Sequence, residues 1–381
     1  MYFSLSEQQR VMQQTLREFA QKEIAPNAAM LDETARFPED NIKKMAAKGY
    51  LGIPIPKKYG GAGADFLSYI LSVEEISRAC ASTGVILSVH TSVGTFPLLF
   101  FGTEEQKQKY IPKLAAGEYL GAFALTEPEA GSDASALRTS AKKDGENYVL
   151  NGNKIFISNG GHAHLYTVFA TVDRTLGSKG ITAFLVEKDT PGFSVGAIEK
   201  KMGLNADITT ELVFADCRIP VTQRLGEEGE GLKIALSLLD GGRIGIGAQG
   251  LGIAQAAYEE ALSYAQSRRQ FGQPIFNFQA IAFKLADMAT QLEAARLLVY
   301  QAAFRKEQGL PCGKQAAMAK MFATDTAMAV TSEAIQIFGS HGYSRKYPVE
   351  RLFRDAKITQ IYEGTNQIQR LVIAKAIARE F

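Results

Sequence analysis

The stretch Phe123–Asp133, which reads FALTEPEAGSD, marks the place where helix-forming sequence gives way to short strand-forming runs. Small residues, hydroxyl groups and a glycine in one loop can present backbone N–H and side-chain O–H donors to a flat polar ligand. The sequence on either side of this stretch differs in its hydrophobic pattern, and that difference predicts the fold.

Residues 1–120 have the pattern of a helical region. Ser6 and Gln9 have the spacing of a capping box, and apolar residues then recur at helical spacing as far as Pro26. The Gly- and Pro-rich segment from Gly49 to Gly63 predicts a loop. Further helices are predicted at Glu39–Lys48, at Asp65–Cys80, and from the capping residue Thr103 through Leu114.

The sequence pattern changes to short β-rich runs between about Gly121 and Gly226. No long helix separates these runs, so antiparallel pairing in a compact β domain is favoured over a parallel doubly wound sheet. Turns are predicted at Asn151-Gly152, Asn159-Gly160 and Pro191-Gly192. The predicted strands are Tyr148–Leu150, Lys154–Ser158, Leu165–Val172, Thr182–Glu187, Phe193–Ala197 and Glu211–Ala215.

Long helical patterns return after Gly229. The order α, β, α predicts an α+β multidomain chain with a helical domain over 1–120, an antiparallel β domain over 121–227 and a second helical domain over 228–381. The predicted helices of the last domain are Leu232–Leu239, Ala248–Ser267, Phe278–Gln308, Lys314–Phe338 and Ile368–Arg379.

One motif in this last region has a misleading form. Gly245–Gly250 matches G-x-G-x-x-G, which binds a dinucleotide pyrophosphate when it follows a strand and opens a helix. Here a helical pattern precedes it and no βαβ alternation follows. We therefore expect these glycines to allow close packing of helices or of a ligand.

The hexapeptide Ile361–Asn366 places Glu363 between apolar neighbours and Gly364. A carboxylate beside bulky apolar groups is desolvated, which raises its pKa and suits it to act as a base near neutral pH. A glycine allows a substrate or cofactor to approach the backbone. The alternative is that Glu363-Gly364 is only a helix end or a turn.

Composition limits the classes of function. The chain has 381 residues, 46% hydrophobic and 22% charged, as in a globular protein of two or three domains with a large core. A net charge of +2 gives no global field for nucleic acid or an anionic membrane, so an anionic ligand needs a local basic site.

The three cysteines, Cys80, Cys217 and Cys312, are far apart and form no CxxC pair. This spacing argues against a disulfide framework and against a zinc site, so no metal is expected. No signal peptide or presequence is expected at the N-terminus, and no stretch is expected to be long enough to span a membrane. These features predict a cytoplasmic protein.

Taken together, Phe123–Asp133 and Ile361–Asn366 on an α–β–α framework resemble the acyl-CoA dehydrogenase family over essentially the whole chain, most closely its short-chain, butyryl-CoA type. The resemblance implies a C-terminal four-helix bundle and FAD bound between that bundle and the β domain. It also implies a flavoprotein oxidoreductase of fatty acid β-oxidation in lipid metabolism, and a homotetramer built as a dimer of dimers.

The resemblance also implies roles for individual residues. Leu125 and Thr126 would contact the flavin ring, and Ser158 would give its hydroxyl to the region of flavin N5. Phe156 stands where the family usually has tryptophan, a residue that this chain lacks altogether. Ser132 would lie near both the flavin phosphate and the CoA portion of the substrate. The other implied FAD contacts are Phe123, Ile157, Arg268, Phe271, Gln279, Gln336, Gly339, Ser340, Thr365 and Gln367.

Arg268 resembles an arginine that meets the FAD pyrophosphate, often from a neighbouring subunit, and a guanidinium suits a phosphate better than an ammonium does. The alternative is a solvated helix end favoured by the helix dipole. The four histidines, His90, His162, His164 and His341, are left without a role.

The segment Asp240–Arg243 resembles one that borders the substrate, although Asp240 and Arg243 could equally form a buried ion pair. A minority of family members carry the catalytic glutamate immediately before this arginine, where this chain has Gly242. The resemblance therefore implies Glu363 as the base, with Tyr362 and Gly364 also bordering the substrate.

The implied reaction is α,β-dehydrogenation of a short- to medium-chain acyl-CoA to the trans-2-enoyl-CoA. Glu363 removes the Cα proton, flavin N5 accepts the hydride, and electrons pass to electron-transferring flavoprotein. Three alternatives remain: an acyl-CoA oxidase that uses O₂, a non-catalytic acyl-CoA- or flavin-binding relative, and a reductase that runs the same chemistry backwards.

Overall fold

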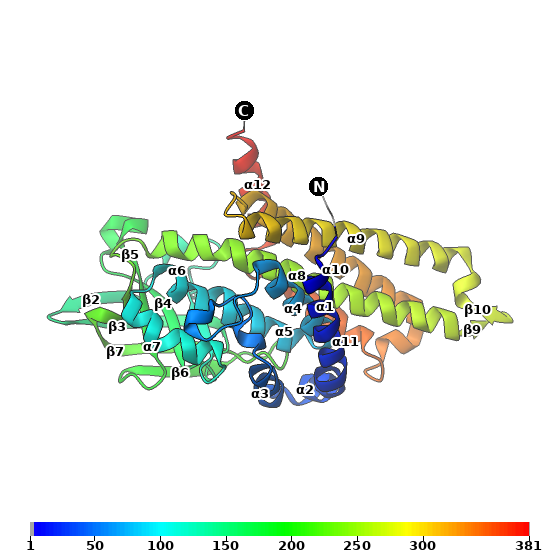
Figure 1. The fold of residues 1–381 in the computed structure, drawn as a ribbon, viewed down its shortest axis with the longest axis horizontal. Helices are drawn as coiled ribbons and strands as arrows, with labels where there is room; N and C mark the ends of the chain where they lie inside the picture. Colours follow the sequence, from blue (N-terminus) through cyan, green and yellow to red (C-terminus); the bar gives the residue numbers. More distant parts are fainter. Residues whose placement is uncertain (1–3, 381) are drawn as a thin grey trace.

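The computed structural model describes residues 4–380 and confirms the predicted α–β–α order (Figure 1). Figure 1 shows the β-sheet at one end of the molecule and the small β9–β10 hairpin at the other, with the long helix α8 running between them. Residues 1–3, the start of the N-terminal segment in which no targeting sequence is expected, and residue 381 lie outside the described residues.

The first region is helical, as predicted. Both capping boxes are present: Ser6 and Thr103 accept from the backbone of Gln9 and Gln106, whose side chains accept in return from the cap N–H groups. The helices are α1 (Glu7–Phe19), α2 (Ala28–Thr34), α3 (Glu39–Ala47), α4 (Phe66–Ala79), α5 (Ala81–Val89), α6 (Phe96–Phe101) and α7 (Glu104–Ala115).

The expectation that no stretch could span a membrane was wrong for Ala81–Phe101, which has sufficient length and a mean hydropathy of 1.6. This run comprises α5, the π-helical segment His90–Thr95 and α6. In the structure, 83% of its most apolar window is buried inside the protein. Its hydropathy is therefore explained by packing within the core.

The middle region forms one eight-stranded sheet in the order β6-β7-β3-β2-β4-β5-β8, with β1 paired to β4. Most pairs are antiparallel, as predicted, but β1–β4 and β2–β4 are parallel. The strands are β1 (Gly121–Ala124), β2 (Ser140–Asp144), β3 (Asn147–Ser158), β4 (Leu165–Thr171), β5 (Ile181–Glu187), β6 (Phe193–Ile198), β7 (Thr209–Pro220) and β8 (Arg224–Leu225).

The turn predicted at Asn151-Gly152 is absent from β3. The strand continues through it, and a shift in its register against β7 falls between Leu150 and Gly152. Gly152 has φ 145°, and a Cβ at this position would lie 2.7 Å from Thr139 Oγ1. This glycine therefore marks an irregular strand rather than a hairpin.

The last region contains the long helices α8 (Gly231–Ser267), α9 (Gln279–Glu307) and α10 (Gly313–Phe338), followed by α11 (Val349–Thr359) and α12 (Asn366–Ile377). The short strands β9 (Arg269–Gln270) and β10 (Gln273–Pro274) join α8 to α9. Two helices were predicted where the structure has the single helix α8, and the sequence did not predict α11.

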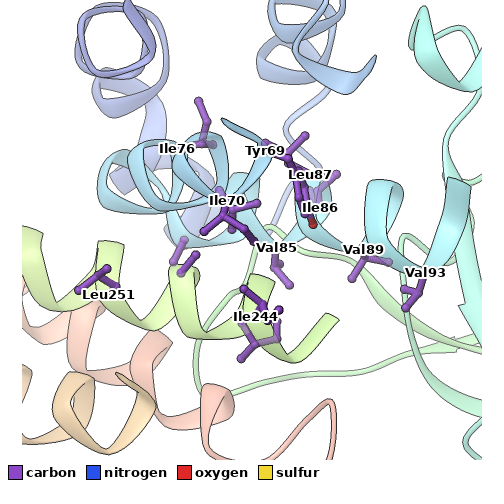
Figure 2. Packing of buried hydrophobic residues seen from close by; sticks show 14 of the residues in the cluster. Tyr69, Ile70, Ile76, Val85, Ile86, Leu87, Val89, Val93, Ile244 and Leu251 are labelled. Atoms are coloured by element: carbon purple, nitrogen blue, oxygen red, sulfur yellow. The ribbon is translucent and has the colours of Figure 1, made fainter. Parts of the chain in front are cut away.

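The Gly245–Gly250 motif lies inside α8 and is a packing surface, as expected. A Cβ at Gly245 would lie 2.6 Å from Ser88 Oγ, and one at Gly247 would lie 3.1 Å from Val299 Cγ2. Figure 2 shows part of the resulting core, where Ile70 of α4 and Val85 of α5 lie next to α8, which carries Ile244 and Leu251. This apolar cluster runs through both helical regions. The domain boundaries after residues 120 and 227 stay a prediction.

Candidate active site

Glu363 lies in the tight turn between α11 and α12. Its backbone has φ 54°, a left-handed conformation that is uncommon outside glycine, and Gly364 follows with φ 86°. The hydroxyl of Thr365 accepts from Ile368 N at 3.3 Å and caps α12. Glu363-Gly364 is thus a turn between helices, and the conformation of this turn sets the direction of the carboxylate.

The carboxylate of Glu363 lies directly over Gly242 of α8. A Cβ at position 242 would lie 2.6 Å from Glu363 Oε2 and 2.9 Å from its Cδ. Glycine at 242 therefore provides the space that this carboxylate occupies. The two positions at which the sequence suggested a catalytic glutamate face the same point, and this chain fills that point from position 363.

The electrostatics of this carboxylate suit a base. Glu363 is partly exposed, but its Oε2 is buried and has no hydrogen-bond partner among the described residues. Burial raises the pKa of Glu363 to about 7, although the charges of Arg243 and Lys320 act to lower it. The carboxylate is therefore available to accept a proton near neutral pH.

Asp240 and Arg243 form the ion pair that the sequence left open. Arg243 Nη1 lies 2.7 Å from Asp240 Oδ1, and Arg243 is only 6% exposed. The Nε of Arg243 is buried without a partner among the described residues. The pair is thus a structural feature, and a role of either residue in substrate binding stays a prediction.

Tyr362 and Lys320 support the turn from two sides. The Tyr362 hydroxyl donates to Gln249 Oε1, and Gln249 Nε2 donates to Ala81 O at 3.2 Å. Lys320 Nζ donates to Gly364 O at 2.9 Å. Sequence reasoning missed both Gln249 and Lys320, because each lies in a helical pattern and faces the turn only after α8 and α10 have packed together.

The loop Leu125–Glu127 is held by a buried ion pair that was also missed. Lys154 is 0% exposed, and its Nζ lies 2.7 Å from Glu127 Oε1 and 3.1 Å from Leu125 O. Ile155 N donates to Thr126 O at 3.0 Å. One signal was available: Lys154 shares the alternation of the buried residues Tyr148 and Leu150 on β3.

Ser158 and Phe156 lie beside this loop on the same strand. Phe156 has φ 57° and is 60% exposed, although it is a large apolar side chain. Ser158 Oγ donates to Asp207 Oδ2 at 2.9 Å, whereas Asp207 Oδ1 is buried without a partner among the described residues. Sequence reasoning assigned the Ser158 hydroxyl to a flavin and did not identify Asp207.

The remaining predicted contacts lie elsewhere. Ser132 is exposed, in the loop after β1, and Gln367 is exposed on α12. Arg268 ends α8, about 39 Å along the helix axis from Gly242 at 1.5 Å per residue. The residues grouped at that far end and exposed there are Arg268, Phe271, Gln279, Gln336, Gly339 and Ser340.

The far-end group is held together by aromatic packing. Tyr264 of α8 stacks on Phe338 of α10 with ring centroids 4.1 Å apart, and its hydroxyl is 2.9 Å from His341 Nδ1. Phe271, in the β9–β10 hairpin, is 93% exposed. The structure thus separates the predicted FAD contacts: Ser158 binds Asp207, whose charge acts on Tyr362 next to Glu363, whereas the far-end group lies at the other end of α8.

Substitution of Glu363 by glutamine is expected to stabilise the protein at pH 8. The folded protein binds more protons than the unfolded chain between the ordinary pKa of 4.5 and about 7, so stability present below pH 4.5 is lost as the pH rises through 7. Glu363→Gln removes that loss, which is on the order of 1–3 kcal/mol. Thermal unfolding at pH 5 and pH 8 measures it, and equal differences from wild type at both values would contradict the buried-carboxylate account.

Comparison with known proteins covers nearly all of this chain. Three family profiles match, described as acyl-CoA dehydrogenase N-terminal domain (residues 6–118), middle domain (122–217) and C-terminal domain (229–378). An acyl-CoA dehydrogenase of Bacillus subtilis is 58% identical over 97% of this chain and 98% of its own. A short-chain specific acyl-CoA dehydrogenase of Clostridium acetobutylicum is 54% identical over 100% of both chains.

Solved structures agree with this result. Butyryl-CoA dehydrogenase from Megasphaera elsdenii superposes with a TM-score of 0.98 at 49% identity, over 99% of this chain and 100% of its own. A chain in the structure described as "Electron transferring flavoprotein of Acidaminococcus fermentans: Towards a mechanism of flavin-based electron bifurcation" gives 0.98 at 52% identity, over 100% of both. An FAD-dependent dehydrogenase gives 0.93 at 34% identity, over 99% and 100%.

Proposed function

Because this chain belongs to the acyl-CoA dehydrogenase family, and is therefore an oxidoreductase that uses FAD, we propose that Glu363 is its catalytic base. The proposed reaction removes one hydrogen from Cα and one from Cβ of a short-chain acyl-CoA and yields the trans-2-enoyl-CoA. The observation that carries the proposal is the Glu363 carboxylate over Gly242, whose buried Oε2 has no hydrogen-bond partner within residues 4–380.

The residues of the Leu125–Glu127 loop and of the end of β3 fit FAD. Phe156 offers an exposed aromatic face, and the partly exposed Thr126 and Ser158 offer hydroxyl groups beside it. A flat ring with polar edges needs this combination of an apolar surface and hydrogen-bonding groups at its border. The residues that would hold the ring are Leu125, Thr126, Phe156, Ile157 and Ser158. When bound, FAD supplies the acceptor for the hydride that leaves Cβ.

The chain's own residues handle the proton. Glu363 takes it from Cα, for which its pKa of about 7 is well matched at neutral pH. As the proton leaves, negative charge develops on the thioester oxygen and requires a fixed hydrogen-bond donor. The backbone N–H of Glu363 makes no hydrogen bond within residues 4–380 and is available for this purpose.

The far-end group suggests a role for a second copy of the chain. Arg268 lies about 39 Å along α8 from Gly242, which faces Glu363, and Gln336 lies about 24 Å along α10 from Lys320, which binds the turn that carries Glu363. We infer that these residues, with Phe271, Gln279, Gly339 and Ser340, complete the FAD site of a neighbouring subunit in a homotetramer. An exposed arginine and an exposed phenylalanine are suited to a pyrophosphate and an interface, respectively.

The electron acceptor proposed for the reduced enzyme is electron-transferring flavoprotein. The support is the similarity of this chain to one in the structure described for that flavoprotein from Acidaminococcus fermentans. We propose that the protein works in the cytoplasm. Hydrogen peroxide formed in step with substrate consumption would instead identify an oxidase that uses O₂.

The test is anaerobic reduction of the bound flavin by saturated acyl-CoAs from C4 to C16. We expect the flavin absorbance to bleach most rapidly with C4, because the relatives named above include short-chain and butyryl-CoA enzymes. Bleaching only with longer chains would retain the reaction and change the substrate. Colourless protein that cannot be reconstituted with FAD, or failure of every acyl-CoA to bleach it, would overturn the proposal.

A further inference from the structure

Lys320 of α10 is a fully buried lysine, 0% exposed, and it forms no ion pair with a carboxylate among the described residues. Its Nζ donates to Gly364 O and to Asn366 Oδ1, each at 2.9 Å. Burying an ammonium group without a carboxylate partner is costly, so a lysine at such a position calls for a reason beyond packing. Gly364 belongs to the turn that carries Glu363. Asn366 is the first residue of α12 and directly follows the cap residue Thr365.

The turn is strained, and side chains of α8, α10 and α12 hold it by hydrogen bonds. Glu363 has φ 54°, a conformation that persists in a non-glycine residue only where its surroundings hold it. Gly364 O accepts from Lys320 Nζ and also from Gln369 Nε2 at 2.8 Å. Lys320 therefore joins the turn to α10, whereas Gln369 joins it to its own following helix, α12.

The charged groups around Lys320 come from each element packed against it. Glu363 faces it from the turn, Asp325 from α10 itself and Arg243 from α8. Burial lowers the pKa of Lys320 to about 7, against the opposing attraction of the two carboxylates. The cations that act on Glu363 are Arg243 and Lys320, and Arg243 is already paired with Asp240.

We propose that Lys320 is a positioning residue for the base: it ties the Glu363–Gly364 turn to α10 and places a positive charge beside the carboxylate. This inference rests on the proposed function of Glu363 and extends it to a residue outside the substrate and cofactor contacts. The hydrogen bond to Gly364 O fixes the direction of the carboxylate over Gly242. The charge allows Glu363 to ionise at a lower pH than burial alone permits.

Two substitutions in the FAD-loaded enzyme separate these effects. Lys320→Gln keeps a hydrogen-bond donor and removes the charge, and Lys320→Met removes both. In both variants the acidic limb of the pH profile of kcat/KM is expected to move upward by about one unit, because one of two nearby cations is lost. Lys320→Met is expected to lose kcat at high pH as well, since the turn is then held less firmly.

The matched control is Thr331→Val on the same helix. Thr331 is buried and, among the described residues, donates to the backbone of α10 alone, at 2.7 Å to Ala327 O and 3.3 Å to Met328 O, so its loss costs stability without affecting the turn. Its acidic limb is expected to coincide with that of wild type. The acidic limb of Lys320→Gln is expected to shift by ~1 pH unit. A shift of less than about 0.3 pH units would overturn the proposal, even if that variant were less stable than wild type.

A second measurement does not require turnover. The carboxylic acid stretch that disappears in Glu363→Gln can be titrated by infrared difference spectroscopy in wild type and in both Lys320 variants without substrate. The midpoint is expected to rise in the variants, and an unchanged midpoint would contradict the proposal. If no acyl-CoA reduces the wild-type flavin, the proposed function fails, but this titration still reports whether Lys320 acts on Glu363.

Discussion

Glu363→Gln is expected to reduce kcat/KM with the best acyl-CoA by at least ~10²-fold, the lower bound for loss of a general base. Glutamine has nearly the same shape, so the turn and the contact with Gly242 are retained. What is lost is the ability to accept the Cα proton. Steady-state assays with an artificial electron acceptor and single-turnover bleaching of the flavin both measure this effect.

Two controls make the result specific. The variant is expected to keep its bound FAD, because Glu363 is proposed to border the substrate and is not among the residues proposed to hold the ring. Glu118→Gln, at an exposed position in the connection between α7 and β1, is expected to behave as wild type. Turnover within a few-fold of wild type in Glu363→Gln would remove Glu363 from the mechanism.

Lys154→Met is expected to destabilise the protein by about 3–5 kcal/mol, the cost of leaving one member of a buried ion pair alone. Glu127 would lose its cation while its carboxylate remained buried, held by Arg138 N at 2.5 Å and Thr139 N at 2.9 Å. Burial acts to raise the pKa of Glu127, but the charge of Lys154 and these hydrogen bonds outweigh it and lower the pKa. Removal of the lysine reverses that balance.

The effect on function follows from the position of the pair. Lys154 also donates to Leu125 O, so its loss releases the loop Leu125–Glu127 that is proposed to contact the flavin. We expect a lower FAD content as well as a lower midpoint in urea. Because the double variant Lys154→Met with Glu127→Gln buries no charge, it is expected to recover part of the lost stability.

Lys142→Met is the surface control for this prediction. Lys142 is exposed on β2, and such a substitution changes stability by at most ~0.5 kcal/mol. If Lys154→Met unfolded at the same urea concentration as Lys142→Met, the pair would not be a support of the loop. Urea unfolding and the ratio of flavin to protein absorbance measure the two consequences separately.

The sequence predicted local structure best where the signal is local. The capping boxes at Ser6 and Thr103 depend on residues three positions apart, and both are present. The predictions at Asn151-Gly152 and at the glycines of α8 had different outcomes for a physical reason. The glycines of α8 pack closely against neighbouring helices such as α5, as expected, whereas Gly152 continues β3 alongside β7 where a turn was predicted.

The candidate site shows the same division. Glu363 was identified from its neighbours in sequence and from the family resemblance, whereas Lys320, Gln249, Lys154 and Asp207 were not identified as site residues. Each of these four lies far along the chain from the residue it supports; Lys320, Gln249 and Lys154 stand in ordinary helix or strand patterns, and Asp207 lies in the loop before β7. Their roles depend on which side chains meet after packing; strand alternation could have predicted that Lys154 is buried, but not that it meets Glu127.

The sequence by itself determined the α–β–α order, the family and the two candidate positions for a catalytic carboxylate, because hydrophobic periodicity and motif residues are properties of the chain. Only the tertiary structure decided that positions 242 and 363 face the same point, since a Cβ at Gly242 would lie 2.6 Å from Glu363 Oε2. It also decided the ionisation of that carboxylate. The pKa near 7 results from burial opposed by Arg243 and Lys320, and these groups meet only when α8, α10 and the turn pack together.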